Sequence, residues 1–351
     1  MADALMHASV ERRIADQLDC QKSVASSLSA SGLVVRSVYQ TERSHLIFRE
    51  ADMPKPRLFH VDAFTNVKFR GNPAGVVLSS DVLTVEQMQD IARELKHSET
   101  AFVLRPDGDD HDVRIRYFTP TTEVPICGHA TIAAHYARAK WLGLKESEVR
   151  QKTGAGIQII SIHPKGGDHR ITMRQGPISF SEPLNDAFRS RICAALRLTS
   201  RDLVTSLPVQ IVSTGHSKVI IPLNEGVDLD GITPDPAALT KLSSLIGCNG
   251  YFPFLIRRGE KAATEGRMFA PAIGIAEDPV TGNANGPLGA YLVKHSLMRH
   301  DNRQFSFEGH QGRALRRDGI VHVTVDIDSG EPCRVSIHGD AVLLFTAELE
   351  V

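Results

Sequence analysis

The chain has 351 residues, 42% of them hydrophobic, and its 40 Lys and Arg against 41 Asp and Glu give a formal net charge of −1. This length predicts two domains, and the even balance of charge argues against nucleic-acid or membrane-surface partners. Because no apolar run approaches the roughly 18–20 residues of a membrane-spanning helix and the five scattered cysteines show no zinc-binding or disulfide spacing, we expect a cytoplasmic protein with reduced thiols.

Residues 1–52 differ from the rest of the chain. They are rich in serine and carry charges of both signs, without the apolar core of a signal peptide or the acid-poor basic face of a transit peptide. We expect a weakly structured N-terminal extension, or an upstream start of translation, since Met53 directly precedes the first strong strand pattern. Function is then expected from residue 57 onward.

The elements expected next are short strands and two helices. Thr84 is placed to cap the first helix, with Gln87 at the capping-box position and an apolar face beginning at Met88. The other elements expected in this half are strands over 71–78, 101–104 and 113–117 and an apolar helix from Gly128 to about 139.

The same order recurs in the second half, which indicates an internal repeat. Arg116-Tyr-Phe-Thr-Pro120 is echoed 151 positions later by Arg267-Met-Phe-Ala-Pro271. A helix capped by Asp235, with Pro236 in its first turn and Gly247 as its stop, matches the Thr84 helix. The remaining counterparts are strands over 215–222, 252–256 and 321–327 and an apolar helix from Gly282 to 293. We therefore predict an α+β fold of two pseudo-symmetric barrel-like β domains, each wrapped around a central helix.

Glu99 is the first candidate for chemistry, because only one of the two repeats carries an acid at this position. It lies at a helix-to-strand corner, and Gly250 is its counterpart under the 151-residue offset. A carboxylate that follows a helix C-terminus and precedes a buried strand is suited to act as a general base. The alternative is a solvated loop glutamate without a catalytic role.

The start of the first apolar helix, at Cys127, Gly128 and His129, is the second candidate. The N–H groups of a first helical turn favour a carboxylate or phosphate, and glycine lets a ligand approach the backbone closely. His129 can donate or relay a proton, and Cys127 can form a thiolate at such a terminus. The alternatives are a capping histidine and a buried, inert cysteine.

The second apolar helix begins in a similar way, within Asp278-Pro-Val-Thr281-Gly282-Asn283. Asp278 and Asn283 add an acid and an amide to another anion-accepting helix start, although Asp before a proline is also a common turn residue. If both helix starts meet at one ligand, Glu99, His129 and Asp278 form a proton-handling set that needs no metal or cofactor.

Six segments carry a resemblance to a known family. They are Phe59-His-Val-Asp-Ala-Phe64, Phe69-Arg-Gly-Asn-Pro73, Ser98-Glu-Thr-Ala-Phe102, Phe118-Thr-Pro120, Cys127-Gly-His-Ala130 and Glu277-Asp-Pro-Val-Thr-Gly-Asn-Ala284. With these segments the chain resembles the PhzF family of phenazine biosynthesis, on the diaminopimelate epimerase fold, and within it the enterobacterial YddE-like branch. The resemblance leaves out only the first fifty-odd residues.

The resemblance implies a first barrel domain over residues 57–181 plus 334–351, a second over 182–333, and an active site between them. It implies a cofactor-independent isomerase that moves a proton between carbons of a small carboxylic acid, such as a cyclic dihydro-aromatic one. Glu99 would shuttle the proton, while His129 and Asp278 would hold the substrate and position the proton. The residues expected to bind the substrate are Cys127, Gly128, Thr281, Gly282 and Asn283. No metal and no cofactor are implied, and a homodimer is expected by family analogy.

Two other functions stay open. Related racemases and epimerases use two thiols, one before the glycine of each buried helix; Cys127 fits this pattern, but Thr281 stands at the second position. A thiol-dependent racemase or epimerase using Cys127 is the first alternative, and a non-catalytic small-molecule-binding or dimerisation module is the second. A hydrolase built on Ser98, His129 and Asp278 is disfavoured, because no Gly-x-Ser-x-Gly motif occurs.

Overall fold

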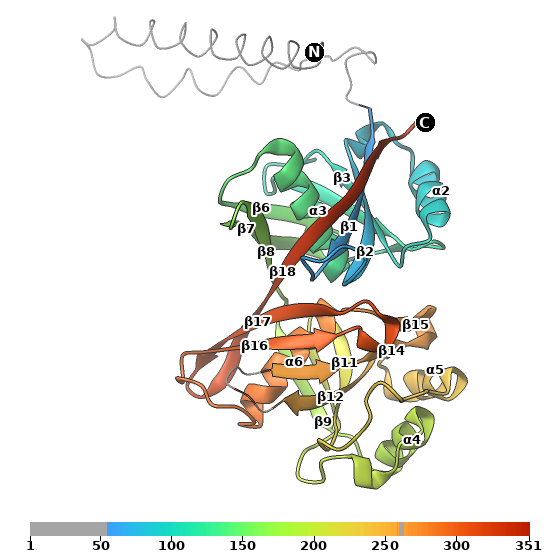
Figure 1. Ribbon diagram of the computed structural model, residues 1–351, viewed down its shortest axis with the longest axis vertical. Helices are drawn as coiled ribbons and strands as arrows, with labels where there is room; N and C mark the ends of the chain where they lie inside the picture. The colour runs from blue at the N-terminus through green and yellow to red at the C-terminus, as the bar shows by residue number, and fades with distance from the viewer. Residues whose placement is uncertain (1–54, 258, 260–262) are drawn as a thin grey trace, which may run out of the picture. The chain divides into compact units, whose positions relative to one another are not determined.

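The computed structural model describes residues 55–257, 259 and 263–351, which belong to one compact unit (Figure 1). The expectation for residues 1–52 lies outside the described residues. The helices are α2 (Val85–Leu95), α3 (Gly128–Leu142), α4 (Asp186–Leu196), α5 (Pro236–Ile246) and α6 (Gly282–Lys294), with short 3₁₀ helices η2 (Ser80–Val82), η3 (Ser200–Asp202), η4 (Pro271–Ile273) and η5 (Arg313–Leu315).

The strands alternate with these helices along the chain. They are β1 (Arg57–Ala63), β2 (Asn72–Leu78), β3 (Thr100–Leu104), β4 (Val113–Phe118), β5 (Glu123–Val124), β6 (Ser147–Thr153), β7 (Gly156–Lys165), β8 (Asp168–Arg174), β9 (Ile178–Pro183), β10 (Gln210–Thr214), β11 (Ser217–Pro222), β12 (Tyr251–Arg257), β13 (Ala263–Gly266), β14 (Met268–Ala270), β15 (Ile275–Asp278), β16 (Gln304–Gln311), β17 (Gly319–Asp328) and β18 (Glu331–Glu348).

The internal repeat is present in the register of the strands. In the first half β2 pairs in parallel with β3, with Gly75 opposite Thr100, and α2 connects the two strands. In the second half β11 pairs in parallel with β12, with Val219 opposite Tyr251, and α5 makes the connection. An antiparallel strand follows in each half, β4 on β3 and β14 on β12. The two halves therefore build the same ladder around corresponding residues.

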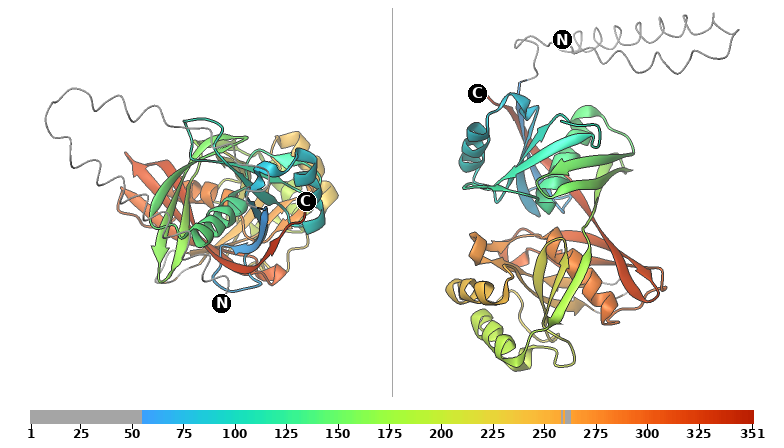
Figure 2. Two further views of the ribbon diagram at one scale, coloured as in Figure 1. Left: turned by 90° about the horizontal axis from the view of Figure 1, so that it is seen from above. Right: turned by 180° about the vertical axis from the view of Figure 1, so that it is seen from behind.

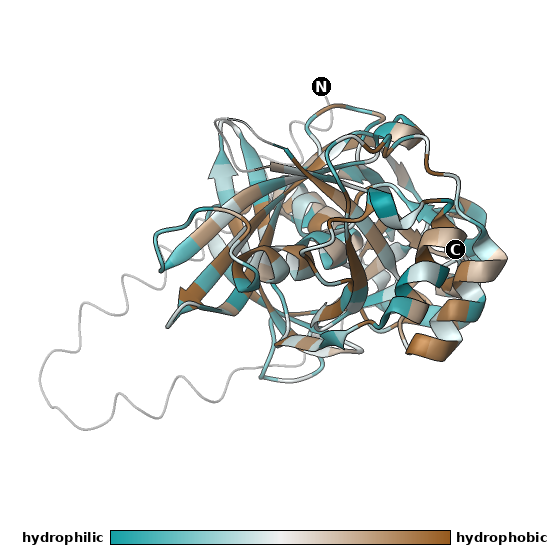
Figure 3. Ribbon diagram, turned by 90° about the horizontal axis from the view of Figure 1, so that it is seen from below, coloured by the Kyte–Doolittle hydropathy of each residue, from teal (hydrophilic) through white to brown (hydrophobic). Residues whose placement is uncertain are grey.

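Each half wraps its strands around one apolar helix, α3 in the first half and α6 in the second (Figure 2). Both helices are buried along most of their length, so their apolar residues gather on no single face. The strands show the complementary pattern, with hydrophobic and hydrophilic residues alternating along them (Figure 3). The expected α+β fold of two barrel-like halves, each around a central helix, is confirmed.

The long strand β18 belongs to both halves. Its first part pairs with β17, where Val335 faces Val325, and its later part pairs with β1, where Ala341 faces Ala63. Between these two regions it also pairs with β8. Figure 1 shows β18 in red as it passes from β17 toward β1. The expected domain boundaries at 181/182 and 333/334 stay a prediction, because β9 and β18 each continue across one of them.

Several expected local features are confirmed. Thr84 and Gln87 form the capping box of α2, and the Asp235 side chain accepts a hydrogen bond at the start of α5. Helix α3 runs past its expected end to Leu142, where Gly143 takes the left-handed conformation that ends it. The hairpin strands β6 to β8 and helix α4 were not expected. Within the described residues, every helix is too short or too polar to cross a bilayer.

Gly289 tests how closely α6 packs on its sheet. A Cβ at this position would lie 2.9 Å from both Val323 Cγ1 and Val325 Cγ2. Alanine inside a helix is ordinarily more stable than glycine by about 0.5–1 kcal/mol, but overpacking a core costs about 1–3 kcal/mol. We expect G289A to lower the free energy of unfolding measured in urea, whereas S244A on the exposed side of α5 leaves it near the wild-type value. A more stable G289A would contradict this packing.

Candidate active site

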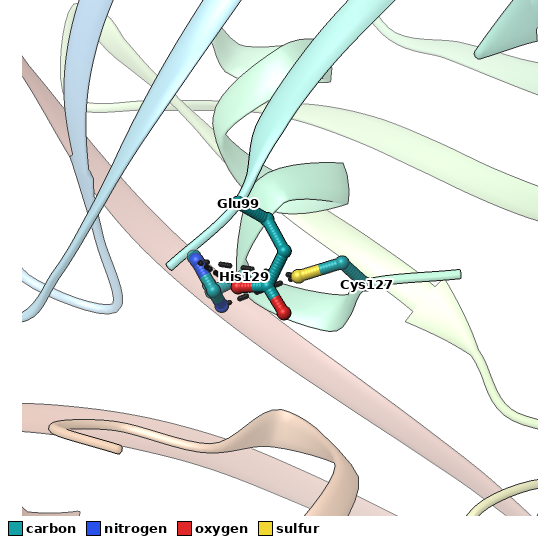
Figure 4. Close-up of side chains that lie close together, drawn as sticks. All are labelled: Glu99, Cys127 and His129. Carbon is teal, nitrogen blue, oxygen red and sulfur yellow. Dashed lines mark hydrogen bonds and ion pairs between the residues drawn. The ribbon is translucent and has the colours of Figure 1, made fainter. Parts of the chain in front are cut away.

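Glu99, Cys127 and His129 meet at the N-terminal end of α3 (Figure 4). The Glu99 carboxylate comes from the corner between α2 and β3, and its Oε2 lies 3.5 Å from Nε2 of His129. The Cys127 Sγ lies 3.4 Å from Nδ1 of the same ring. The imidazole thus lies between a carboxylate and a thiol, and all three groups are largely shielded from solvent.

The Glu99 carboxylate is only partly satisfied within the protein. Its side chain is 13% exposed, yet its Oε2 has no hydrogen-bond partner among the described residues. A buried carboxylate oxygen without a donor is costly in a folded protein, so such an oxygen marks a place where a ligand can supply the missing partner. The neighbouring Ser98 Oγ lies 3.3 Å from His129 Nε2 and so competes for that nitrogen.

Cys127 is a poor nucleophile in this setting. Burial raises the pKa of its thiol well above the usual range, and the negative charge of Glu99 raises it further. The thiol therefore stays protonated near neutral pH. The ligand atoms of Glu99, Cys127 and His129 lie within 4.8 Å of one another, so this trio is the group of side chains in the described chain that could hold a metal ion, if the thiol lost its proton.

Asp278 lies at the end of β15, close to the start of α6, and its carboxylate is fully engaged. Asn72 Nδ2 donates to its Oδ1 at 2.7 Å, and Thr281 Oγ1 donates to its Oδ2 at 2.5 Å. Burial raises the pKa of Asp278, while the charge on His129 lowers it and that on Glu99 raises it. Asp278 is therefore electrostatically coupled to the cluster on α3. Ser98, His129 and Asp278 are not joined by hydrogen bonds into a hydrolase-like relay.

Two glutamines that sequence reasoning missed hold the start of α6. Gln311 accepts a hydrogen bond from the Thr281 amide at 3.0 Å and donates to the Asp278 carbonyl at 2.8 Å. Gln175 donates to Asn283 Oδ1 at 3.0 Å. Neither glutamine belongs to a recognisable sequence motif. Each lies at the end of a strand distant in sequence, so only the folded structure shows that it is buried beside the start of α6.

The two helix starts approach each other through a glycine. A Cβ on Gly128 would lie 3.4 Å from Asn283 Oδ1, so the first turns of α3 and α6 are neighbours. The first-turn amides of a helix have no acceptor within the helix. Those of Gly128, His129 and Gly282 donate to no other group in the described part of the chain. These amides are available to an anion placed between the helices.

A cavity of about 340 Å³ borders both helix starts, because its lining includes Asn283 and Ile126, the residue before Cys127. This volume suits a small single-ring molecule. Another cavity, of about 420 Å³, is lined by Arg267 and Gln311 and contains none of the predicted site residues. The first cavity reaches the predicted site through Asn283 at the start of α6, whereas Glu99, Cys127, His129 and Asp278 lie outside its lining.

Two barrel-like halves, whose buried helices meet end to end beside a cluster of ionisable side chains, define the class of diaminopimelate epimerase-like isomerases. Within this class the chain belongs to the PhzF family: the family model described as phenazine biosynthesis-like protein matches residues 61–347.

Individual relatives agree with this assignment. The chain is 58% identical over 294 residues to the uncharacterized isomerase YddE of Salmonella typhimurium, a match that covers 84% of this chain and 98% of that protein. It is 33% identical over 242 residues to trans-2,3-dihydro-3-hydroxyanthranilate isomerase of Pseudomonas aeruginosa, covering 67% of this chain and 79% of that protein. The crystal structure of a PhzF-family protein of Bacillus anthracis matches with a TM-score of 0.75 and 33% identity, covering 85% of this chain and 100% of that one.

The comparisons confirm that the protein is an isomerase of the PhzF family with the expected fold. The roles of the individual site residues stay predictions. The structure brings Glu99, Cys127 and His129 together at α3 and places Asp278, Thr281, Gly282 and Asn283 at the start of α6, while the Gly128 backbone adjoins Asn283.

Asp278 and Asp340 should show opposite dependences of stability on pH. Burial raises the pKa of Asp278 from 3.8, so its stabilising contribution is present below that pH and is lost as pH rises through the folded-state pKa. Asp340 is the matched control: burial alone would raise its pKa, but hydrogen bonds from Arg170 and Lys165 lower it to about 2. Its contribution is present above the unfolded-state pKa and lost as pH falls toward 2.

We therefore expect D278N to gain free energy of unfolding relative to wild type as pH rises from 4 to 7, in the range where ionisation of Asp278 is disfavoured. D340N should instead be less stable than wild type by a nearly constant amount over most of this range, because wild-type Asp340 stays ionised and paired, and the difference should shrink as pH falls toward 2. Urea unfolding at several pH values measures both. A D278N variant that gains no stability relative to wild type between pH 4 and 7 would contradict the environment of Asp278.

Metal removal tests the cluster at α3. We expect prolonged dialysis of the protein against a chelator to leave activity and thermal stability unchanged, because a metal ion at this cluster would have to displace the proton of the Cys127 thiol, whose pKa burial raises well above its usual range. Metal analysis of the protein before dialysis is the control. Two results together would show that the trio binds a metal ion: dialysis abolishes an activity that added Zn²⁺ restores, and C127S shows no such response to Zn²⁺.

Proposed function

We propose that the protein is a cofactor-independent isomerase that moves a proton between carbons of a small, cyclic carboxylic acid, with Glu99 as the general acid and base. The observation that carries this proposal is the Glu99 carboxylate, whose Oε2 lacks a hydrogen-bond partner within the described residues and lies beside His129 at the start of α3. The counterpart of Glu99 in the other half is Gly250, so the second half provides no carboxylate at the corresponding corner.

The reaction follows from the neighbours of that carboxylate. Glu99 takes a proton from a carbon whose electrons shift into the conjugated system of the substrate, and as the double bond moves it delivers a proton to another carbon. The proton held on the Glu99 carboxyl can exchange with solvent before it is delivered. No atom is gained or lost. His129 lies within 3.5 Å of the carboxylate and can hold the substrate or steady the charge on Glu99. The amides at the starts of α3 and α6 offer donors to the negative charge that develops on the substrate.

In this proposal Asp278 supports the site without touching the substrate. Both of its oxygens are already occupied by Asn72 and Thr281, so it is placed to fix the start of α6 and to set the charge around His129. We propose that Asp278 acts through His129 and through the start of α6, and that Asn283 and Gly282 bind the substrate directly.

The alternative thiol mechanism has less support. Epimerisation with two thiols needs one reactive group from each helix start. Burial raises the pKa of Cys127 well above its usual range, and the hydroxyl of Thr281 at the second position donates its proton to Asp278. A single, protonated thiol is poorly suited to remove a proton from carbon.

The test follows hydrogen exchange at carbon. We expect the protein to incorporate deuterium from ²H₂O into trans-2,3-dihydro-3-hydroxyanthranilate, the compound in the name of the Pseudomonas aeruginosa relative. Replacement of Glu99 by Gln should reduce that rate by at least about 10²-fold, because removing a general base costs at least this much. Mass spectrometry of the recovered compound measures the label.

The matched control is C127S, which we expect to retain most of the exchange activity. Urea unfolding of both variants checks that the fold is intact. Equal exchange rates for wild type and E99Q would remove Glu99 from the mechanism, and loss of exchange in C127S alone would favour the thiol alternative. If wild type exchanges no hydrogen with this compound, the substrate class in the proposal is wrong.

A further inference from the structure

The two halves carry different residues at one corresponding rung of the ladder. In the first half the pairing of Gly75 with Thr100 places Ala74 beside Glu99. In the second half the pairing of Val219 with Tyr251 places Lys218 beside Gly250. In the first half the short side chain, Ala74, is on β2 and the long one, Glu99, precedes β3. In the second half the long side chain, Lys218, is on β11, and Gly250, without a side chain, precedes β12.

Lys218 occupies the space that a counterpart of Glu99 would need. A Cβ built on Gly250 would lie 2.4 Å from Lys218 Cδ and 2.9 Å from its Cε. No side chain fits there unless the lysine moves. The aliphatic part of Lys218 thus passes over Gly250. This place in the second half corresponds to the place in the first half from which Glu99 reaches its cluster.

The ammonium group of Lys218 has few partners inside the protein. The residue is only 9% exposed, and its Nζ donates to the carbonyl of the adjacent Ser217 at 3.1 Å. Among the described residues no carboxylate forms an ion pair with it, although a buried ammonium has three donors to satisfy. The neighbouring strands connect this position to the site: a Cβ on Gly250 would also lie 3.4 Å from Met268 Sδ, and Met268 pairs with Asp278 between β14 and β15. Burial lowers the pKa of Lys218, and the neighbouring Cys248 and Asp278 raise it in part.

We propose that Lys218 binds the carboxylate of the substrate from the second half of the protein, while Glu99 of the first half moves the proton. An anionic substrate brings a further negative charge to a buried site that already holds the acids Glu99 and Asp278, and Lys218 supplies a compensating positive charge. The ammonium also favours the transition state, because negative charge grows on a carboxylate when the adjacent carbon loses its proton. This inference rests on the proposed function only in taking the substrate to be a carboxylic acid.

The experiment measures binding without turnover, so that it stands apart from the role of Glu99. Benzoate and its neutral analogue benzamide are titrated into the full-length protein by calorimetry at millimolar concentrations. We expect wild type and E99Q to bind benzoate in preference to benzamide. Lys218→Met should lose at least tenfold in benzoate affinity with no change for benzamide, whereas Lys218→Arg should retain most of the preference. Lys241→Met, on the exposed side of α5, is the matched control and should bind as wild type does.

Other outcomes overturn the proposal. Unchanged benzoate affinity in K218M, or no preference of the wild type for benzoate over benzamide, shows that Lys218 does not bind a carboxylate. If K218M does not fold, K218Q takes its place, and K218R still has to keep the preference. A K218M protein that binds benzoate normally but has lost deuterium exchange would make Lys218 a proton donor instead. Loss of benzoate affinity in K218M together with normal exchange in E99Q would keep the Lys218 site and reject the proposed role of Glu99.

Discussion

The structure depends on the close approach of two buried helix starts, those of α3 and α6. A helix start with unpaired amides is unfavourable in an apolar interior unless polar partners surround it. Here Gly128 lets the two first turns come together at Asn283, and Gln175 and Gln311 satisfy the groups that would otherwise be left without partners. What remains unpaired between the helices is a small polar site enclosed by two hydrophobic halves.

Two equivalent halves would by themselves make a symmetric site, yet moving a proton from one carbon to another distinguishes the two ends of a substrate. The two halves differ in the residues that they carry at one corresponding pair of strand positions, and this makes the site asymmetric. Where the first half has Ala74 and Glu99, the second has Lys218 and Gly250. The same backbone ladder thus offers an acid from one side and a cation from the other, and the differences between the repeats hold the chemistry.

Sequence patterns predicted what short stretches of chain decide. The capping box of Thr84, the Asp235 cap and the alternation along β17 each depend on neighbours within a few residues, and each is confirmed. The repeat also predicted that the starts of α3 and α6 would meet at one ligand. The structure places the two starts side by side, and the shared ligand stays a prediction. Gln175, Gln311 and the contact of Lys218 with Gly250 could not be predicted in this way, because each depends on strands distant in sequence that only tertiary packing brings together.

The course of β18 has a consequence for how the protein is made. Its later part pairs with β1, the first strand of the described chain, and its earlier part with β17. During synthesis β1 leaves the ribosome with one edge lacking its final neighbour, and that neighbour emerges after all the other strands. Such a distant pairing slows folding and leaves an open strand edge exposed in the meantime. The edge of β1 is therefore free to pair with a wrong strand until β18 has been translated.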